Sequence, residues 1–351
     1  MNPDVKRFGY GTKFISVMDI LNNQFIYYDD IRASVEVIDG DLETYGVNYG
    51  DILFQRSSET LEDVGQANVY LDSKPVVFGG FVIRGKSKGN YNPLFFRYLL
   101  ASPAVRKRIM TKGAVAQHFN IGQDGLSKVC VDIPCKQEQE KIAKLLSLLD
   151  ERMATQSKII EDLKKLKSAI SLNVLHSDAW EQFKIKDIAK IGRGRVISSI
   201  EISQQKNPTY PVYSSQTSND GIMGYLDDYM FEGEYISWTT DGANAGTVFY
   251  RNGKFNCTNV CGLLKLRKEF DTHFVSLVLA EATKKYVSIN LANPKLMNNT
   301  MGNIQIRLPK LEEQKRVSIV FRELQGLWVV YNSLLTNYTK QKQYLLSQMF
   351  I

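Results

Sequence analysis

The residues that would carry the most conspicuous chemistry in this chain form a phosphate-loop pattern. Residues 80–87 read Gly-Phe-Val-Ile-Arg-Gly-Lys-Ser, which has the glycine, lysine and serine spacing of a nucleotide-binding loop. Such a loop needs small residues between its glycines and a helix that begins at once. Phe81, Val82 and Ile83 favour a strand instead, and the turn residues 88–93 cannot begin a helix directly. We therefore interpret this match as a coincidence.

No other pattern typical of catalysis or metal binding is found. The four cysteines (130, 135, 257 and 261) lack zinc spacing, and the chain has only three histidines. Neither a Gly-x-Ser-x-Gly elbow nor a Gly-x-Gly-x-x-Gly turn occurs. No apolar run approaches the roughly 18 residues of a membrane span, so we expect a cytoplasmic protein that does not contact a membrane. A stand-alone nuclease or ATPase stays open as an alternative.

Positive charge is gathered in stretches that have no acidic residues. The net charge is +7, and nine lysines and arginines but no acidic residue lie between Asp72 and Asp124. The second half has similar stretches between residues 241 and 269 and between residues 281 and 312. Cations of this kind suit a polyphosphate, because each neutralised phosphate releases counterions. A solvated surface would explain one such stretch, but its recurrence in both halves favours nucleic acid.

Amide side chains follow the basic stretches. The loops at residues 113–120 and 290–299 are rich in asparagine and glutamine, which can bond to adenine through two hydrogen bonds in the major groove. Turn formation by asparagine is the competing explanation for any single residue.

The elements that would position these residues occur twice. The segment that begins at Ile133-Pro134 recurs at Leu308-Pro309, and the same offset holds without a gap to the end of the 351-residue chain. Each half is expected to be α+β. The predicted strands cover residues 50–56 and 233–239, then 76–84 and 260–266, followed by helices at 93–110 and 272–287 and a short strand that ends at the repeated proline.

A long helix is predicted after each proline. Apolar residues recur there at alternating steps of four and three, which is the seam of a coiled coil, and each helix would span roughly 50 Å. The predicted seam residues are Ile142, Leu146, Leu149, Met153, Ile160, Leu163, Val317, Phe321, Leu324, Trp328, Leu335 and Leu345.

The direction of the two helices follows from the connections. Only residues 176–179 separate the first helix from the second globular region, so that region should begin at the far end of the helix. The second helix must then run back in order to bury its seam. This predicts two long antiparallel helices with a globular lobe at each end. A plain coiled-coil rod that joins proteins without reading DNA is the alternative.

These features together resemble the specificity subunit of a Type I restriction-modification system. The resemblance covers nearly the whole chain and is strongest at residues 133–149 and 308–324, and at the second-lobe segments 180–188, 210–217 and 219–222. It implies that each lobe is a target recognition domain for one half of a bipartite DNA site. The helices would set the spacing and dock the methyltransferase subunits, and the chain itself would perform no chemistry.

The resemblance divides the chain into a first target recognition domain (1–134), a first spacer helix (135–176), a second target recognition domain (177–309) and a second spacer helix (310–351). It implies double-stranded DNA, two methyltransferase subunits and restriction (endonuclease and translocase) subunits as partners. No cofactor is expected on this chain, and S-adenosylmethionine, ATP and Mg are expected in the partner subunits. The candidate DNA contacts are Arg56, Lys86, Lys88, Lys112, Gln117, Asn120, Arg193, Arg195, Ser215, Gln216, Thr239, Thr240, Asn244, Lys295 and Asn298.

The first lobe departs from the second at its beginning. If residues 13–17 correspond to residues 211–215, the second lobe has a long segment from Trp180 to Pro211 before this point, whereas few residues precede Lys13. The first lobe would then lack the opening strand that contains the tryptophan. We expect that lobe to be less stable or impaired in binding, which limited proteolysis of the two lobes would test.

Overall fold

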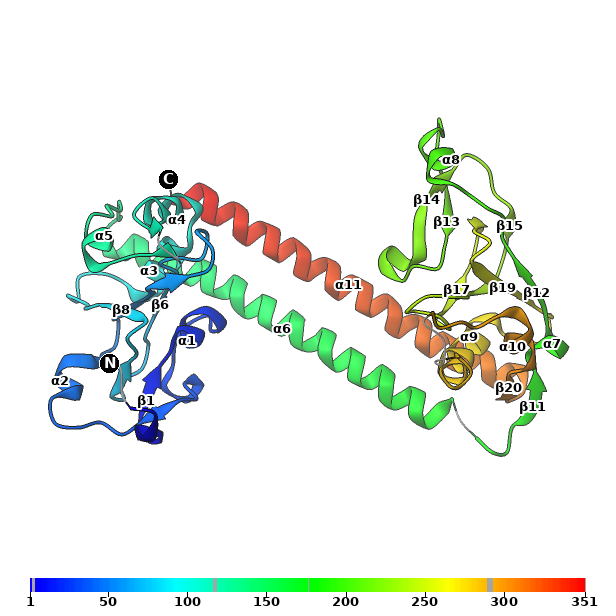
Figure 1. The fold of residues 1–351 in the computed structure, drawn as a ribbon, viewed down its shortest axis with the longest axis horizontal. Coiled ribbons are helices and arrows are strands. Elements are labelled where there is room, and N and C mark those ends of the chain that lie inside the picture. Colours follow the sequence, from blue (N-terminus) through cyan, green and yellow to red (C-terminus); the bar gives the residue numbers. More distant parts are fainter. Residues whose placement is uncertain (2–3, 116–118, 176, 289–292, 351) are drawn as a thin grey trace. The chain divides into compact units, whose positions relative to one another are not determined.

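The structure is a computed structural model that describes residues 1, 4–115, 119–175, 177–288 and 293–350. The chain forms two compact units, of which the first comprises Met1–Lys158 with Asn332–Ile351 and the second Ile159–Tyr331. Each unit contains one lobe and part of each of two long helices (Figure 1). The unit boundaries fall inside those helices, so the domain limits expected at residues 134, 176 and 309 stay predictions.

The two long helices confirm the prediction made from the repeat. Helix α6 runs from Lys136 to Val174 and helix α11 from Leu311 to Met349, so both contain 39 residues. In the first unit, Lys342 Nζ lies 2.5 Å from Asp150 Oδ1, and Arg152 Nη1 lies 3.4 Å from the Tyr338 hydroxyl. The residue numbers therefore fall along α11 as they rise along α6. The helices are therefore antiparallel. Each of the predicted seam residues is buried or half-buried.

A lysine that recurs within the seam has a partner in each unit. Lys342 Nζ donates to Asp150 Oδ1 in the first unit, and Lys167 Nζ donates to Gln325 Oε1 at 3.3 Å in the second. Lys167 and Lys342 are equivalent positions of the repeat, and so are Asp150 and Gln325. The repeat thus places the same contact in both units, with a buried carboxylate in one and an exposed amide in the other.

The glutamine of the repeated segment explains why that segment is repeated. Gln139 Nε2 donates to the Pro134 carbonyl at 2.8 Å, and its Oε1 accepts from the Asn92 amide at 2.9 Å. Gln314 does the same with the Pro309 carbonyl at 2.8 Å and the Asp271 amide at 3.0 Å. Asn92 and Asp271 cap the main helix of their lobes. Each buried amide therefore joins the start of a long helix to the lobe beside it.

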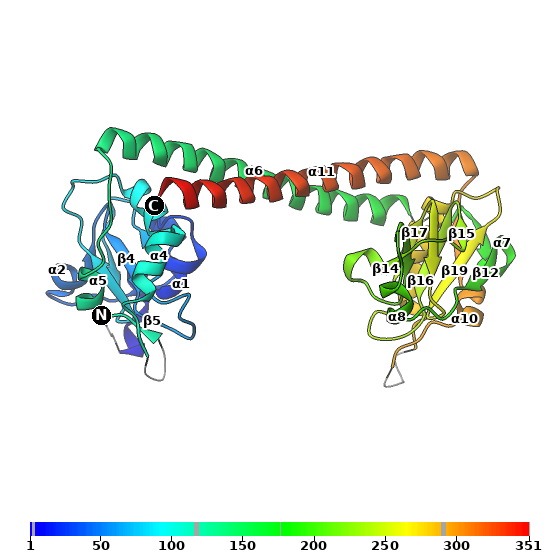
Figure 2. The same cartoon turned by 90° about the horizontal axis from the view of Figure 1, so that it is seen from above.

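The lobe of the second unit is built on two four-stranded sheets (Figure 2). The first has the order β12-β19-β16-β17 and the second the order β14-β13-β18-β15. Helix α9 (Thr272–Ala282) packs on β16 and β17, and its inward side chains share a core with Trp238 and Phe321. The strands are β11 (Glu181–Lys184), β12 (Ala189–Arg193), β13 (Tyr210–Tyr213), β14 (Ile222–Leu226), β15 (Phe231–Glu232), β16 (Tyr235–Thr239), β17 (Val248–Arg251), β18 (Lys254–Cys257), β19 (Cys261–Leu266) and β20 (Gln305–Leu308).

The lobe of the first unit repeats most of this plan. Its sheets have the orders β6-β4-β8, β2-β1-β7-β3 and β5-β10-β9, and helix α3 (Pro93–Ala101) packs on β6. The parallel pair Phe14↔Val77 matches the parallel pair Val212↔Asn256, which confirms the correspondence between residues 13–17 and 211–215. The strands are β1 (Phe8–Ile15), β2 (Ser34–Val35), β3 (Gly46–Val47), β4 (Ile52–Gln55), β5 (Ser57–Ser58), β6 (Ala67–Val69), β7 (Val76–Phe78), β8 (Val82–Gly85), β9 (Ala114–Val115) and β10 (Phe119–Asn120).

Several predicted elements differ from those observed. The helix expected at 93–110 is two helices, α3 and α4 (Pro103–Met110), because buried Ser102 is extended and caps the second one before Pro103. The strand expected at 76–84 is two strands, β7 and β8. The strand expected before Pro134 is not formed, whereas its counterpart β20 pairs with β11. Residues 82–85 of the phosphate-loop pattern form strand β8, as the sequence predicted.

The remaining helical elements are short. None of the helices within the described residues is long and apolar enough to cross a lipid bilayer. The short elements are η1 (Val5–Arg7), α1 (Val17–Asn22), η2 (Tyr28–Asp30), α2 (Asp41–Tyr45), α5 (Gln123–Ser127), α7 (Ile185–Ile188), α8 (Ser199–Ser203), η3 (Ser218–Gly221), η4 (Thr283–Lys285) and α10 (Asn298–Asn303).

Candidate nucleic-acid interface

In the second unit, candidate residues from four separate segments meet at one edge of the lobe. Arg193 ends strand β12, and its Nε donates to Asn298 Oδ1 at 2.9 Å at the start of α10. Its Nη1 donates to the Asn259 carbonyl at 3.3 Å in the turn before β19. We use the name recognition edge for Arg193, Ser215, Thr240, Asp241, Lys295 and Asn298.

The other members of the recognition edge are joined by short contacts. The Leu296 amide donates to the Thr240 carbonyl at 2.8 Å, and Asp241 forms an isolated antiparallel bridge with Lys295. Ser215 donates to the Val260 carbonyl and lies 3.3 Å from Asp241 Oδ1. The end of β16 thus holds the loop that carries Lys295, whose side chain is exposed.

Burial separates the predicted contact residues of this unit into two groups. Thr239 and Thr240 are 1% and 2% exposed, and their hydroxyls donate to the carbonyls of Asn244 and Val260. Gln216 is half-buried and donates to the Ile222 carbonyl at 2.5 Å. These side chains hold the backbone of the edge. Asn244 and Lys295 are exposed, while Arg193 and Asn298 are half-buried, so this second group is accessible to a ligand.

Arg195 lies near the recognition edge, but its charge is already compensated. Its guanidinium forms an ion pair with Glu201, with one N–O distance of 2.9 Å, and these hydrogen bonds hold the pKa of Glu201 below its usual value. The chain passes close to β18 here, since a Cβ on Gly194 would lie 1.6 Å from the Cys257 carbonyl oxygen. Only glycine fits between the two arginines.

Arg251, which organises the loop after β13, is not among the contact residues predicted from the sequence. Its side chain is 2% exposed, and its Nη1 pairs with Asp220 Oδ2 at 2.8 Å while its Nε donates to Ser237 at 3.0 Å. The guanidinium carbon also lies 3.7 Å from the centre of the Tyr213 ring. Asn219 and Asp220 have positive φ angles of 49° and 52°, so the arginine stabilises a strained turn. The Asn-Asp-Gly triplet at 219–221 is the sequence feature that indicates this turn.

In the first unit, the structure brings together fewer of the predicted residues. Asn120 pairs with Ser57 in the β10–β5 ladder, and the Arg56 carbonyl accepts from the Ile121 amide at 2.9 Å, so Arg56 and Asn120 lie together. This pairing corresponds to the bridge between Asp241 and Lys295. Lys112 follows α4, and its carbonyl would lie 3.2 Å from a Cβ on Gly125 in α5.

Two predicted lysines of the first unit lie elsewhere. Lys86 and Lys88 follow β8 at the end of the β4–β8 ladder that is opposite to Arg56, because the two strands are antiparallel. The predicted contact Gln117 lies outside the described residues.

Part of the positive charge in the first unit serves the fold. Arg84 donates to the Gly46 carbonyl, and Arg97 donates to the Gln24 carbonyl at 3.1 Å. Arg106 donates to the carbonyls of Glu62, Val64 and Gly65 at 2.7 to 2.8 Å. Burial lowers the pKa of Arg97 and of Arg106. The acid-free stretch is thus a weaker indicator of a phosphate-binding surface than its composition suggests.

Comparison with known proteins relates both halves of the chain to one kind of domain. The family model described as "Type I restriction modification DNA specificity domain" matches residues 2–165 and 177–325. A candidate type I specificity subunit of Mycoplasma pneumoniae, S.MpnORF201P, is 38% identical over 204 residues, which cover 55% of this chain and 82% of that protein. The specificity subunit of the type I restriction enzyme MpnII from the same organism is 45% identical over 141 residues, which cover 40% of this chain and 42% of that protein.

Solved structures with low sequence identity share the fold. The S subunit of a Type I restriction-modification system from M. genitalium superposes with a TM-score of 0.63 at 16% identity, over 99% of this chain and 94% of that chain. A chain from a structure of a type I R-M system that describes complex assembly and conformational transition gives a TM-score of 0.54 at 12% identity, over 97% of this chain and 94% of that chain.

Proposed function

The chain belongs to the family of Type I restriction-modification DNA specificity proteins, and from this premise we propose how its residues recognise DNA. Each lobe contacts one half of a bipartite duplex target. In the second lobe the contact surface is formed by the accessible residues Arg193, Lys295 and Asn298 of the recognition edge, together with Asn244. In the first lobe it is the corresponding edge at Arg56, Lys112 and Asn120. The observation that carries this proposal is the contact of Arg193 with Asn298, which is 105 residues later in the chain and lies beside Lys295 in the sequence.

The chemistry of the recognition edge suits both kinds of DNA contact. Exposed Lys295 supplies a cation for phosphate, and Arg193 and Asn298 supply hydrogen-bond donors and acceptors for base edges. Arg193 is oriented by its bonds to Asn298 and Asn259, which reduces the conformational freedom that it would lose on binding. The buried Thr239 and Thr240 position the loop without touching DNA.

The long helices have a second part in the proposed function. We propose that they set the gap between the half-sites and dock methyltransferase subunits. Apolar side chains outside the seam support this, since Leu148 in the first unit and Leu327 and Val330 in the second are 45–54% exposed. Restriction subunits then join the complex, the chain itself is non-catalytic, and S-adenosylmethionine, ATP and Mg belong to the partner subunits.

The proposal is tested by DNA binding of the complex assembled with methyltransferase subunits. Duplexes selected from a random pool give the two half-sites, and fluorescence anisotropy then gives the affinity of each variant as a function of salt. Lys295→Ala should weaken binding to all duplexes alike and reduce the salt slope by roughly 0.9. Asn298→Ala should relax the preference at one position, by about 1–3 kcal/mol of discrimination.

A matched control lies at the other end of strand β19. Lys268 is exposed and follows β19, whereas Val260 and the recognition edge lie before that strand. Lys268→Ala removes the same charge from the same unit, and we expect no change in affinity or salt slope. Equal effects of Lys268→Ala and Lys295→Ala would show that only the net charge matters, and the proposed edge would be wrong.

A further inference from the structure

A second charged surface of the second unit lies at the end of strand β19 that is opposite to the recognition edge. It is a depression of about 360 Å³ between the end of β19 and the starts of helices α9 and α11. Strand β19 has six residues, so it separates this depression from the recognition edge by roughly 20 Å. Four exposed cations line the depression, and we call them the basic patch: Lys265, Arg267, Lys268 and Lys315.

The acidic residues that line the same depression are already bonded within the lobe. Glu234 accepts a hydrogen bond from the Tyr250 hydroxyl, and its carboxylate lies 3.7 Å from the guanidinium of Arg322. Asp271 Oδ1 accepts from the Phe274 amide at 2.7 Å and so caps α9. Both carboxylates serve the fold, and in the described part of the chain neither forms an ion pair with the basic patch.

The cations of the basic patch have few partners of their own. Lys265 Nζ donates to the Glu234 carbonyl at 3.2 Å and lies 4.3 Å from the centre of the Tyr235 ring. Glu269 and Glu313 line a neighbouring depression instead. Within the residues that the structure describes, none of the four cations pairs with a carboxylate. The basic patch therefore presents to solvent a positive charge that no ion pair neutralises.

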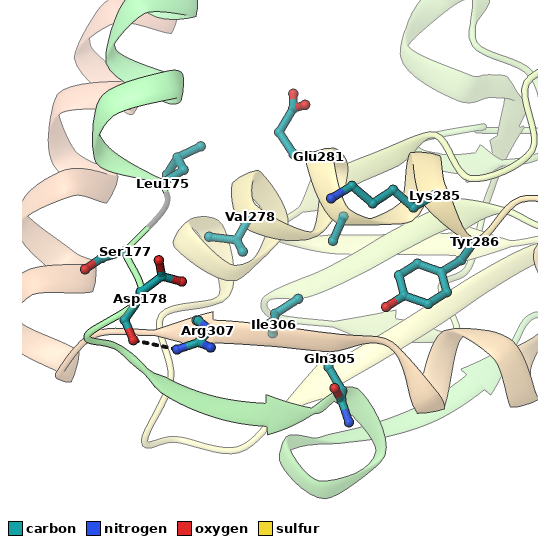
Figure 3. Close-up of a pocket in the computed structure, with 11 residues that line it drawn as sticks. Leu175, Ser177, Asp178, Val278, Glu281, Lys285, Tyr286, Gln305, Ile306 and Arg307 are labelled. Carbon is teal, nitrogen blue, oxygen red and sulfur yellow. Dashed lines mark hydrogen bonds between the residues drawn. The ribbon is translucent and has the colours of Figure 1, made fainter.

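A depression at the other end of α9 shows that this surplus of charge is not general to the lobe. Figure 3 shows its lining, in which Asp178 and Glu281 accompany Lys285 and Arg307. Arg307 donates to the Asp178 carbonyl at 2.5 Å, and Glu281 pairs with Lys284 at 2.7 Å. Acidic and basic residues are balanced there, so that depression does not specify a charged partner.

The repeat places cations at the equivalent position of the first unit. The β4–β8 and β16–β19 ladders have the same register, so Lys86 and Lys88 correspond to Lys265 and Arg267. Both lysines are exposed, and they lie at the end of their ladder that is opposite to Arg56. The recurrence indicates that these cations have a function in each unit other than the proposed DNA contact.

The surface next to the basic patch indicates the class of partner. Ile319 follows Lys315 by four residues, so both lie on the same face of α11, and Ile319 is 57% exposed. An apolar side chain beside a charged rim is typical of a protein–protein interface, whereas a phosphate backbone would leave Ile319 uncovered. A polypeptide with acidic side chains therefore fits this surface better than DNA does.

We propose that the basic patch docks an acidic segment of a methyltransferase subunit, and that Lys86 and Lys88 do the same in the first unit. This inference rests on the proposed function, which requires such subunits, and it adds a charged contact to the apolar surface of the long helices. Opposite charges speed the encounter of the two proteins and fix the register in which the subunit lies on α11.

The test uses the full-length chain and the purified methyltransferase subunit of the same system. Zero-length coupling of amines to carboxylates should link Lys265, Lys268 or Lys315 to one acidic segment of that subunit, which mass spectrometry identifies. In titration calorimetry, Lys265→Glu combined with Arg267→Glu should weaken one of the two binding sites by about tenfold or more and reduce its dependence on salt. Adding Lys86→Glu and Lys88→Glu should weaken the other site as well.

A rescue and a matched control separate docking from a loss of folding. Replacement of the linked acidic residues of the subunit by lysine should restore its affinity for Lys265→Glu with Arg267→Glu, which a misfolded chain would not show. Lys284→Glu combined with Lys285→Glu is the control, because it reverses two exposed lysines at the other end of α9. We expect this control to bind the subunit as the unaltered chain does.

The outcomes distinguish this inference from the proposed function. Equal effects of the patch variant and the control variant would overturn the inference. It would also be overturned if the patch variant assembled normally but bound DNA more weakly at saturating methyltransferase subunit, since the patch would then contact phosphate. An unaltered chain that binds no methyltransferase subunit would overturn the docking part of the proposed function as well. Failure of Lys295→Ala to weaken DNA binding would refute the recognition edge alone.

Discussion

The buried contact between Asp150, Lys342 and Tyr98 allows the sharpest prediction about stability. Asp150 accepts from Lys342 at 2.5 Å through Oδ1 and from the Tyr98 hydroxyl at 2.8 Å through Oδ2. The side chain of Asp150 is 6% exposed and that of Lys342 is 24% exposed. These contacts join α6, α11 and α3 inside the first unit, and burial together with Asp150 raises the pKa of Tyr98. The carboxylate therefore holds three elements together.

We expect Asp150→Ala to destabilise the first unit by about 3 kcal/mol. Removing one partner of a fully buried ion pair costs about 3–5 kcal/mol, and a hydrogen bond to a charged group contributes about 1.5–3 kcal/mol. Lys342 can turn partly toward water, so we expect the loss of stability to lie near the lower end of the range for a buried ion pair. Gln325→Ala is the matched control in the second unit, where the exposed contact with Lys167 is 3.3 Å long, and it should cost at most about 1 kcal/mol.

Native-state hydrogen exchange is the suitable assay, because it follows each unit separately and does not assume that the whole chain unfolds in one step. The protected amides of α3 should lose about 3 kcal/mol of protection in Asp150→Ala and retain it in Gln325→Ala. The double variant Asp150→Ala with Lys342→Met should recover part of the loss, because it removes the lysine left without its partner. Equal and small losses in both single variants would refute the reasoning that burial gives the contact its strength.

Three further predictions concern pH, charge and spacing. His273 accepts or donates a 2.8 Å hydrogen bond with Ser318, and burial followed by the charge of Arg322 lowers its pKa from 6.5 to about 4, so the unfolded chain binds the proton more tightly. The second unit should therefore lose stability as the pH falls from about 6.5 to about 4. Thermal melts of His273→Gln should show a smaller loss of stability over this pH range. A pH profile that the substitution leaves unchanged would exclude this histidine as the cause. Glu201→Gln should release Arg195 for a phosphate contact and raise the salt slope of DNA binding by roughly 0.9, and an unchanged slope would place Arg195 away from DNA. One heptad added to both α6 and α11 at the boundary between the units lengthens each helix by about 10 Å, which is the length of about 3 base pairs of duplex DNA. Selection of bound duplexes should then return the same half-sites with a wider gap between them. Altered half-sites would contradict the assigned role of the helices.

The sequence alone predicted those features that depend on local pattern and on the repeat. The alternating apolar spacing indicated both long helices and their seam, and the turn before β16 indicated the strand that supports Lys295. The constant offset between the two copies predicted that the lobes are equivalent. These features were accessible because periodicity and internal similarity can be read directly from the order of residues.

Tertiary structure decided which side chains are available and which are already bonded. Thr239 and Lys295 both looked like contact residues in the sequence, but one hydroxyl is buried against the Asn244 carbonyl while the other side chain is exposed. Arg106 and Arg251 carry charges that composition assigns to the surface, although both donate to groups inside the fold. Residues 130–133 have the pattern of a strand and do not form one, because a strand requires a partner from elsewhere. Partners that are distant in the chain determine burial and pairing, and a single sequence does not specify those partners.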